Sequence, residues 1–423
     1  MIEQLKLDFN KIIGSLKISN KNIEFRKHNL NQFVENGFPN KRVEDWKFSD
    51  LNQIISSNIN NLSFYSDLTP NKIAAMYETL LNPKLAIFID KIEHNKIVFI
   101  NGVISDIDFS YEDESKILIT KDLDQNEDIK DINSLVSLNN ALISNYLRLT
   151  IKESYSLNKP LIIYNVTTKD LKSTALNVKT EIILEKNSSL KLISLFEDNS
   201  ENNFINIVQN FNISQDAVLK NYRIDNKKNS NIKYFYSNIN LEKNSISENF
   251  IYSVGSKFIK NEVNCNLNDM YSSAFINGVI KLSNTQHHEI KTNINHLAEN
   301  TKSYQLIKTV LNDKAKGIYQ GKIYVDAKAQ KTNGYQLSKA LLLNESTEFN
   351  GKPELEIYAD DVKCSHGSTS GNLDEDSIFY LMSRGLSHKQ SKELLINGFL
   401  LDAVEKITDL EIKNFIKDMM GIT

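Results

Sequence analysis

The turn Leu184-Glu185-Lys186-Asn187-Ser188 sets the pattern for the middle of this chain. Residues 241–245 repeat it letter for letter, and residues 311–314 (Leu-Asn-Asp-Lys) vary it. Between about residues 175 and 360, polar turn clusters of this kind follow one another at steps of roughly 12 to 18 residues. A short, regular period of strand and turn indicates a repeat architecture.

The segments between these turns have the character of strands. β-branched and aromatic residues alternate with polar ones, as in Ile232, Tyr234 and Tyr236, and the whole chain has only five prolines. Short, evenly spaced strands form either a sandwich or a solenoid. A sandwich of this length would need more glycine and proline at its corners. We therefore predict a mainly β protein, a flattened right-handed parallel β-helix (solenoid) whose coils bury their faces by stacking and whose open ends leave strand edges unpaired.

Helical patterns flank the repeats and predict three parts. We expect an N-terminal helical domain over residues 1–84 and a C-terminal helical domain over residues 371–423. Between them, the β-helix core is expected over residues 85–370, with a helical insertion near residues 131–152. Additional short strands are predicted at residues 85–89, 97–100, 117–120 and 161–166.

Capping signals mark several of the helices. In the N-terminal part, a helix that starts near residue 22 is expected to stop at Gly37. In the C-terminal part, Ser387 with Gln390 forms a capping box, and Thr408 with Glu411 forms a second one.

Composition excludes several classes of protein. The chain of 423 residues has a net charge of -3, so it lacks the basic excess of a nucleic-acid binder. Its two cysteines, Cys265 and Cys364, speak against a disulfide framework and favour the cytoplasm. The first residues lack the apolar core of a signal peptide, and no apolar run approaches the roughly 20 residues of a membrane span. We therefore expect neither a nucleic acid nor a membrane as partner.

Asparagine is abundant, and two explanations stay open. One is nucleotide bias in the source genome. The other is that asparagine and aspartate replace glycine at tight turns, because both tolerate positive φ.

The common catalytic motifs are missing from the sequence. There is no phosphate-binding G-x-x-x-x-G-K-[ST] loop, no G-x-S-x-G elbow and no H-E-x-x-H. We therefore expect that the chain is not an enzyme. His287, His288 and His296 with Glu289 could suggest a metal, but His287 and His288 would point to opposite faces of a strand. We interpret them as surface or turn histidines.

The stretch from Asp360 to Gly371 carries the most chemistry. If residues 357–366 are extended, then Asp360, Cys364 and His366 share one face. A thiolate, an imidazole and a carboxylate on one side are ligands for a soft or borderline metal, and Lys363 could favour the thiolate. The alternative is a structural strand end followed by a glycine-rich turn.

Residues 358–367 (Tyr-Ala-Asp-Asp-Val-Lys-Cys-Ser-His-Gly) closely resemble a signature of the SufBD family, which belongs to the SUF iron–sulfur cluster assembly machinery. The two cysteines favour the SufD type within that family. Further matching segments are residues 37–39, 42–48, 321–323, 329–332, 335–336, 341–343, 355–357, 374–375, 378–381 and 383–385.

The resemblance implies a function. It implies a non-ATPase scaffold subunit that forms a heterodimer with a SufB-like paralogue through the β-helices. It implies that the C-terminal helices dock a SufC-like ABC-type ATPase, with these candidate contacts: Phe379, Tyr380, Arg384, Gly385, Leu394 and Phe399. It also places His366, with Cys364 as its weaker companion, at the subunit interface as candidate ligands of an iron ion or a nascent iron–sulfur cluster.

A complete cluster needs about four ligands, so the isolated chain is expected to bind none stably, and a transient cluster would be shared with a partner subunit. An isolated chain can also form a homodimer, because an edge meant for a paralogue can pair with itself. Two other functions stay open: a β-solenoid enzyme that acts on a polysaccharide, and a purely structural partner with no metal contact.

Overall fold

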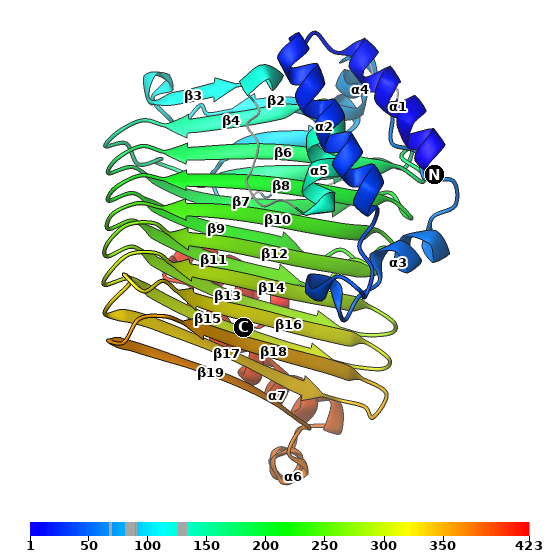
Figure 1. Ribbon diagram of the computed structural model, residues 1–423. Coiled ribbons are helices and arrows are strands. Elements are labelled where there is room, and N and C mark those ends of the chain that lie inside the picture. Colours follow the sequence, from blue (N-terminus) through cyan, green and yellow to red (C-terminus); the bar gives the residue numbers. More distant parts are fainter. Residues whose placement is uncertain (67–69, 81–88, 90, 126–132, 423) are drawn as a thin grey trace.

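The computed structural model describes residues 1–66, 70–80, 89, 91–125 and 133–422 (Figure 1). The strands are β1 (Asn95–Ile100), β2 (Val103–Asp108), β3 (Ile117–Thr120), β4 (Tyr146–Ile151), β5 (Leu161–Thr167), β6 (Ala175–Leu184), β7 (Ser189–Asp198), β8 (Phe204–Ile213), β9 (Val218–Asp225), β10 (Ile232–Leu241), β11 (Ile246–Ser253), β12 (Phe258–Leu267), β13 (Ser273–Leu282), β14 (His287–His296), β15 (Lys302–Leu311), β16 (Lys316–Val325), β17 (Thr332–Leu342), β18 (Glu348–Ile357) and β19 (Val362–Gly371). The helices are α1 (Ile2–Ser15), α2 (Asn20–Asn36), η1 (Glu44–Trp46), α3 (Leu51–Asn58), α4 (Pro70–Leu80), η2 (Glu114–Lys116), η3 (Leu123–Gln125), α5 (Ser134–Leu142), α6 (Glu375–Ser383), α7 (His388–Val404) and α8 (Leu410–Met420).

The strands form two facing sheets of a parallel β-solenoid, as the repeat of turns predicts. One sheet has ten strands in the order β19-β17-β15-β13-β11-β9-β7-β5-β1-β2, and the other has nine in the order β18-β16-β14-β12-β10-β8-β6-β4-β3. Successive coils pair in parallel, and partners are about one coil apart: Ile232 pairs with Phe258, and Lys316 with Glu348. Among the strands that the structure describes, only β1 with β2 and β3 with β4 pair antiparallel, which closes the N-terminal end of the stack.

The turns between coils use asparagine and aspartate where the backbone needs positive φ. Asn187, Asn244 and Asp313 have φ values of 57°, 61° and 57°. In the two identical turns, Ser188 and Ser245 each donate a hydrogen bond to the carbonyl three residues earlier, at 2.6 and 2.7 Å. The turn explanation for part of the asparagine content is thus confirmed, because these side chains occupy a region that costs most other residues steric strain.

The interior of the solenoid is built from columns of apolar side chains. Ile182, Phe211, Ile239, Cys265 and Ile294 follow one another in register on five neighbouring strands, and all are buried. Burial raises the pKa of the Cys265 thiol to about 12. Cys265 therefore serves as a small apolar residue of the core and not as a ligand.

An ionic cluster interrupts this apolar interior near one row of turns. The Lys233 ammonium contacts both the Asp198 and the Asp225 carboxylates, and the three side chains are at most 3% exposed. Burial raises the pKa of Asp225. Burial alone would lower the pKa of Lys233, but the two carboxylates outweigh it and the pKa lies above its ordinary value. The cluster links neighbouring coils, because Asp198, Asp225 and Lys233 lie on β7, β9 and β10.

Helices cover the outer faces of both sheets (Figure 1). Helices α1, α2 and α5 pack on the nine-stranded sheet, where Phe38 lies edge-on against Phe204 at 5.4 Å between ring centres. Helix α4 instead packs on the ten-stranded sheet through Met76 and Tyr77. The C-terminal helices α7 and α8 pack on the ten-stranded sheet through Leu400, Val404 and Ile416. In the described part of the chain, no helix is long and apolar enough to cross a membrane.

The segment after Gly37 is fastened to the nine-stranded sheet by a buried ion pair. Lys260 and Glu289 lie 2.7 Å apart, and both are fully buried. The Lys260 ammonium sits 4.1 Å from the centre of the Trp46 ring, and Ser49 donates a hydrogen bond to Glu289 at 2.8 Å. This cluster fixes η1 and the following residues against strands β12 and β14.

Two local predictions differ in part from the structure. The helical insertion expected near residues 131–152 is present as Ser134–Leu142, but Tyr146–Ile151 is strand β4, because it pairs with β6 and its alternate residues enter the core. The cap of α8 is Asp409, which accepts the Ile412 N–H at 3.1 Å, and not Thr408, whose hydroxyl donates to Glu248. The Ser387–Gln390 capping box is present, and α2 ends at Gly37 as expected. Of the strand predicted at residues 85–89, residues 85–88 lie outside the described residues.

Candidate functional site

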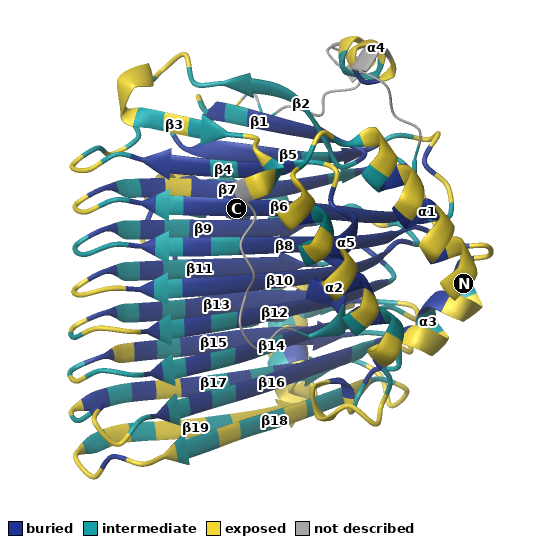
Figure 2. Ribbon diagram, turned by 45° about the horizontal axis from the view of Figure 1, so that its top comes forward, coloured by how far each residue is buried: buried dark blue, intermediate teal, exposed yellow. Residues whose placement is uncertain are grey.

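The last coil of the solenoid has two strands without an outer neighbour. β18 ends the nine-stranded sheet, and β19 ends the ten-stranded sheet. Most of their residues are exposed or half-buried, whereas the inner strands are largely buried (Figure 2). Each strand has ten residues, so the coil presents long rows of unpaired backbone groups that can accept a further strand.

β18 carries its proline on the free side. The Glu348 N–H donates to the Ala315 carbonyl and the Tyr358 N–H to the Val325 carbonyl, so even-numbered residues of β18 donate toward β16. Pro353 is odd-numbered, and its missing N–H therefore falls on the unpaired edge. Proline is tolerated on sheet edges, where it removes a donor that a wrong partner could use. The free edge of β18 can thus accept a further strand, but it offers no backbone N–H donor at Pro353.

Cys364 and His366 lie on the inner face of β19. They are alternate residues of the strand and so point to the same side. That side is the interior, because Cys364 packs against the buried cluster of Ile323 and Val325, and Gln336, which pairs with His366, is buried. Cys364 is half-buried and His366 is exposed at the open end. The two residues therefore share a face, as the alternation predicts.

Asp360 does not join them through the strand. β18 ends at Ile357 and β19 begins at Val362, so Asp360 lies in the turn between them and is exposed. The prediction of one extended strand through residues 357–366 is wrong. The chain turns here because Ala359 inserts into the interior between the two strands.

The Cys364 thiol is not activated in this chain. Burial raises its pKa, and a hydrogen bond from the Gly334 backbone offsets only part of that effect. Lys363 is exposed and, as the neighbouring residue of the strand, points to the opposite face. The expectation that Lys363 favours the thiolate is therefore wrong. A metal ion at this thiol would itself have to displace the proton.

The interior beside His366 is polar. The Gln336 amide spans from β17 to the opposite sheet and donates to the Gly321 and Glu354 carbonyls at 3.3 and 3.4 Å. A Cβ atom on Gly321 would collide with the Tyr319 hydroxyl and the Gln336 side-chain oxygen, so the position requires glycine. Inner coils also have polar side chains in this column, where Asn221 donates to Asn249 at 3.1 Å.

Cys364 and His366 are a pair and not a complete metal site. Among the described residues, no group of three or more His, Cys, Asp or Glu side chains is placed to hold a metal ion. A site built on these two residues would need further ligands from outside the described chain.

The histidines of β14 are structural. His287 faces outward and His288 inward, as the alternation predicts, but none of the three is a surface or turn residue, so that interpretation is wrong. His288 is bonded to the Ser253 hydroxyl at 2.9 Å, and His296 to the Thr301 hydroxyl at 2.7 Å. Burial lowers the pKa of His288 and of His296 to about 4, which keeps both rings neutral.

Ser49, His287 and Glu289 form a cluster with the residue types of a hydrolytic triad. The Ser49 hydroxyl lies 3.0 Å from His287 Nε2 and 2.8 Å from Glu289 Oε2. In a catalytic triad the carboxylate orients the histidine, whereas here it accepts from the serine. Ser49 is also only 1% exposed, so no substrate reaches it. The cluster fastens the N-terminal segment to the sheet.

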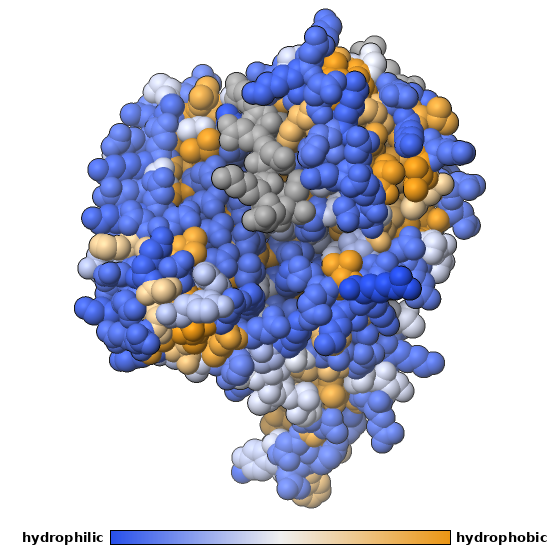
Figure 3. All heavy atoms as spheres, in the orientation of Figure 1, coloured by the Kyte–Doolittle hydropathy of each residue, from blue (hydrophilic) through white to orange (hydrophobic). Residues whose placement is uncertain are grey.

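The C-terminal helices divide the predicted docking residues between two environments. Phe379, Tyr380 and Leu394 are 74%, 56% and 52% exposed on α6 and α7, and α6 projects beyond the last coil (Figure 1). Hydrophobic atoms are visible at this end of the molecule (Figure 3). Arg384 stacks on Tyr380 at 5.3 Å.

The two remaining predicted docking residues have structural roles. Gly385 follows α6 with φ 95°, a conformation that favours glycine. Phe399 turns toward the body, where the Lys308 ammonium lies 4.2 Å from its ring centre. The apolar surface available to a partner is therefore on α6 and the start of α7, and Phe399 is not part of it.

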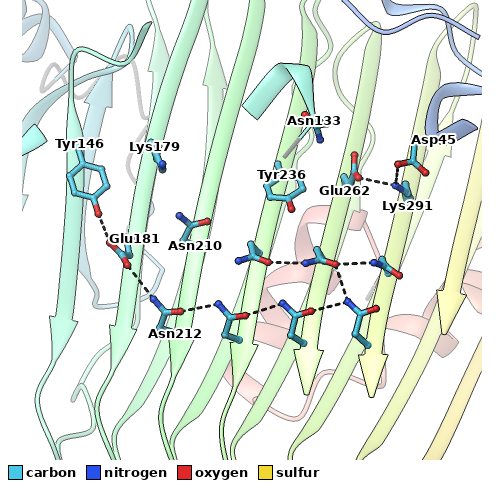
Figure 4. A pocket seen from close by; sticks show the side chains of 16 residues that line it. Asp45, Asn133, Tyr146, Lys179, Glu181, Asn210, Asn212, Tyr236, Glu262 and Lys291 are labelled. Atoms are coloured by element: carbon cyan, nitrogen blue, oxygen red, sulfur yellow. Dashed lines mark hydrogen bonds and ion pairs between the residues drawn. The ribbon is translucent and has the colours of Figure 1, made fainter. Parts of the chain in front are cut away.

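A groove that the sequence analysis missed lies on the outer face of the nine-stranded sheet. It is a groove of about 590 Å³, bordered by Tyr146, Lys179, Tyr236 and Lys291 (Figure 4). Its floor consists of asparagines that repeat from strand to strand. The sequence holds the signal as four copies of Asn-x-Asn, at residues 210–212, 238–240, 264–266 and 293–295. Their spacing of about one coil hides them from any short sequence window.

The asparagines form two hydrogen-bonded rows across the strands. In the longer row, Asn295 donates to Asn266 at 2.8 Å, Asn266 to Asn240 at 2.9 Å and Asn240 to Asn212 at 3.0 Å. Asn212 donates to the Glu181 carboxylate at 3.1 Å, which ends the row. The amide dipoles therefore all point the same way, toward a negative charge.

The fold and the incomplete site define a class: a parallel β-solenoid with helices on both flanks, one closed end, and one open end that bears a cysteine and a histidine. Residues 165–399 match the family described as SUF system FeS cluster assembly, SufBD core domain. The chain belongs to this family, and so to the proteins of SUF iron–sulfur cluster assembly.

Relatives agree along most of the chain. It is similar to the iron–sulfur cluster assembly protein SufD of Escherichia coli (strain K12), with 24% identity over 93% of this chain and 90% of that protein. It is also similar to the SufBD family protein slr0076 of Synechocystis, with 25% identity over 87% of this chain and 84% of that protein. Protein ABCI7, chloroplastic, of Arabidopsis thaliana matches over 26% of this chain and 24% of its own length, with 38% identity.

Proposed function

We propose that the chain is a non-ATPase scaffold subunit that helps to build or transfer nascent iron–sulfur clusters at an interface with another subunit. The observation that carries the proposal is the last coil. Its two edges lack partners, and its inner face presents Cys364 and His366 together at the open end. Family membership supports an iron–sulfur cluster as the cargo, and the geometry of the last coil supports this location for it.

The unpaired edges favour a partner with the same architecture. A SufB-like solenoid could continue both sheets across the interface by main-chain hydrogen bonds, which give affinity, while side chains at the edge give specificity. Because Pro353 has no N–H on the free side of β18, this edge would disfavour a partner strand that needs every backbone N–H donor. A second copy of this chain can occupy the same edges when the paralogue is missing.

The ligand count favours a shared site. Iron–sulfur clusters are held by about four protein ligands, mostly cysteine thiolates. This chain offers the half-buried Cys364 and the exposed His366, whereas Cys265 is sealed in the core. His366 is the stronger candidate, because it is exposed and a neutral imidazole is a common metal ligand. Ligands from the partner would complete the site.

The exposed end of the C-terminal helices suits an ATPase partner. Phe379, Tyr380 and Leu394 form an apolar surface on elements that project from the solenoid. Aromatic residues of this kind dominate the energetics of protein interfaces. A SufC-like ABC-type ATPase bound there could move α6 without unfolding the coils, since α6 packs mainly against α7.

The experiment is co-expression of the chain with a SufB-like and a SufC-like partner, followed by iron and sulfide analysis of the purified complex. His366→Ala should lower the iron and sulfide content several-fold, and Cys364→Ala should lower it less. Ser365→Ala is the matched control, because Ser365 lies between them on the opposite face of the same strand. Normal cluster content in the His366→Ala complex would leave a purely structural role as the answer.

Partner binding has a separate test. Phe379→Ala with Tyr380→Ala should abolish co-purification of the ATPase and leave the paralogue bound. Phe399→Ala should instead destabilise the chain, because Phe399 packs on the body. Retention of the ATPase by the Phe379→Ala/Tyr380→Ala variant would refute the assignment of this surface.

A further inference from the structure

The groove over the asparagine rows is not used by the proposed function. It opens on the outer face of the nine-stranded sheet, whereas Cys364 and His366 lie on the inner face of the other sheet. A row of amides can simply stiffen a sheet. The question is whether this groove has properties that a stiffening row does not need.

The amides keep hydrogen-bonding capacity that faces the groove. An asparagine amide has two N–H donors and two acceptor lone pairs. Asn240 and Asn266 each use one N–H and one lone pair within their row. Each therefore keeps one donor and one acceptor side by side. In the shorter row, Asn293 donates to Asn264 at 3.0 Å and Asn264 donates to Asn238 at 2.9 Å. The side-chain oxygen of Asn293 accepts no hydrogen bond, and neither does that of Asn210, which lies outside the row.

The charged side chains at the groove have partners within the protein, and Lys179 donates to the Asn140 side-chain oxygen at 2.7 Å. Lys291 bridges Glu262 at 2.9 Å and Asp45 at 2.7 Å. Arg148 pairs with Glu181 at 2.8 Å. An anionic ligand would have to break these pairs. A metal ion is no better suited, because in the part of the chain that the structure describes no group of three carboxylate, thiol or imidazole ligands is close enough to bind one.

The spacing of the rows argues against an extended peptide. Neighbouring strands lie about 4.8 Å apart, so the amides of one row repeat at that distance. In an extended peptide, groups on one side repeat about every 6.6 Å, so successive peptide groups could not stay in step with successive amides. Hydroxyl groups on neighbouring carbons of a sugar or polyol are closer together, and a donor and an acceptor on one amide can bind such a pair.

We propose that this groove is a binding site for a neutral polyhydroxylated ligand, either a short carbohydrate chain or a small polyol. The asparagine amides on the floor of the groove bind vicinal hydroxyl pairs. The Glu181 carboxylate fixes the direction of the longer row. This site does not depend on the proposed role of His366.

The test is saturation-transfer NMR on the full chain with three probes at millimolar concentration: maltohexaose, sorbitol and tetraglycine. Transfer to maltohexaose alone supports a carbohydrate chain, and transfer to sorbitol as well supports a small polyol. Asn240→Ser with Asn266→Ser should weaken binding about tenfold, since each hydrogen-bonding group removed lowers affinity several-fold. Asn333→Ser is the control, because Asn333 is a half-buried strand asparagine of the other sheet.

Three results would overturn the proposal. These are no transfer to either polyhydroxylated probe, equal transfer in the double variant, or transfer to tetraglycine alone, which would indicate a peptide site. If the double variant does not fold, as judged by circular dichroism, Asn295→Ser replaces it, because Asn295 is the first donor of its row and accepts no hydrogen bond from a neighbouring asparagine. Unchanged binding by a folded Asn295→Ser chain would count equally against the site.

Discussion

Replacement of Lys233 by methionine tests how the ionic cluster inside the solenoid contributes to stability. Methionine has a similar length but cannot neutralise Asp198 and Asp225, both of which are at most 3% exposed. Removal of one partner from a buried ion pair costs about 3–5 kcal/mol, because an unpaired charge stays buried. Since one ammonium serves two carboxylates here, we expect a loss at the upper end, about 5 kcal/mol, at pH 7.5.

The loss should depend on pH. In the variant, burial without the Lys233 ammonium holds the pKa of the Asp225 carboxyl above its value of about 3.9 in the unfolded chain. A raised pKa in the folded state means that stability is full at low pH and is lost as pH rises through the folded value. Asp225 already has its pKa raised to about 6 by burial in the native cluster. The Lys233→Met chain should therefore be closer to the native chain at pH 5 than at pH 8.

The assay is urea unfolding followed by tryptophan fluorescence and circular dichroism at pH 5, 6.5 and 8. Asp198→Asn and Asp225→Asn added to Lys233→Met should restore much of the lost stability, because a neutral cluster has no buried charge. A loss below about 1 kcal/mol in the single variant would refute the reasoning. So would a loss that does not change with pH, or a triple variant as unstable as the single one.

Three further predictions concern packing and caps. Gly321→Ala should destabilise the chain by about 1–3 kcal/mol, because the added Cβ has no room. Gly398→Ala should stabilise the chain by about 0.5–1 kcal/mol, because Gly398 lies in open space on α7. Urea unfolding measures both effects. Trp46→Ala should cost about 3–5 kcal/mol and release the N-terminal segment, seen as faster proteolysis near residue 45; proteolysis at the native rate would contradict this. Burial opposes ionisation of Asp409, but hydrogen bonds from Lys191 and the first turn of α8 outweigh it and lower its pKa. Asp409→Ala should therefore cost about 1 kcal/mol at pH 7 and progressively less below about pH 4, measured by thermal unfolding; a cost that persists at pH 2.5 would contradict this.

The sequence predicts those features that short windows encode. The turn residues Asn187 and Asn244 announce positive φ through their type, and the strands between them alternate visibly. Helix ends such as Gly37 and the Ser387 capping box are equally local. The family signature located the pair Cys364 and His366, and strand alternation explains why the two share a face.

Features that depend on stacking are invisible in such windows. The asparagine rows join residues about one coil apart, and Lys233 meets Asp198 at a distance of 35 residues along the chain. His288 and His296 resemble surface residues until the coils enclose them. Asp360 was misplaced because the turn before β19 depends on Ala359 entering the core, which no local pattern shows.

The helices that lie across the coils have a consequence for how the protein comes apart under load. A stack in which each coil touches only its neighbours unravels from its ends. Here Glu44 and Asp45 of η1 bind strands β18 and β14, while Thr408 and Asp409 bind strands from β7 to β11. The contacts on each flank thus connect several coils, so these coils share a pulling force. A single-molecule force trace should show a few large ruptures in place of a staircase of coil-sized steps.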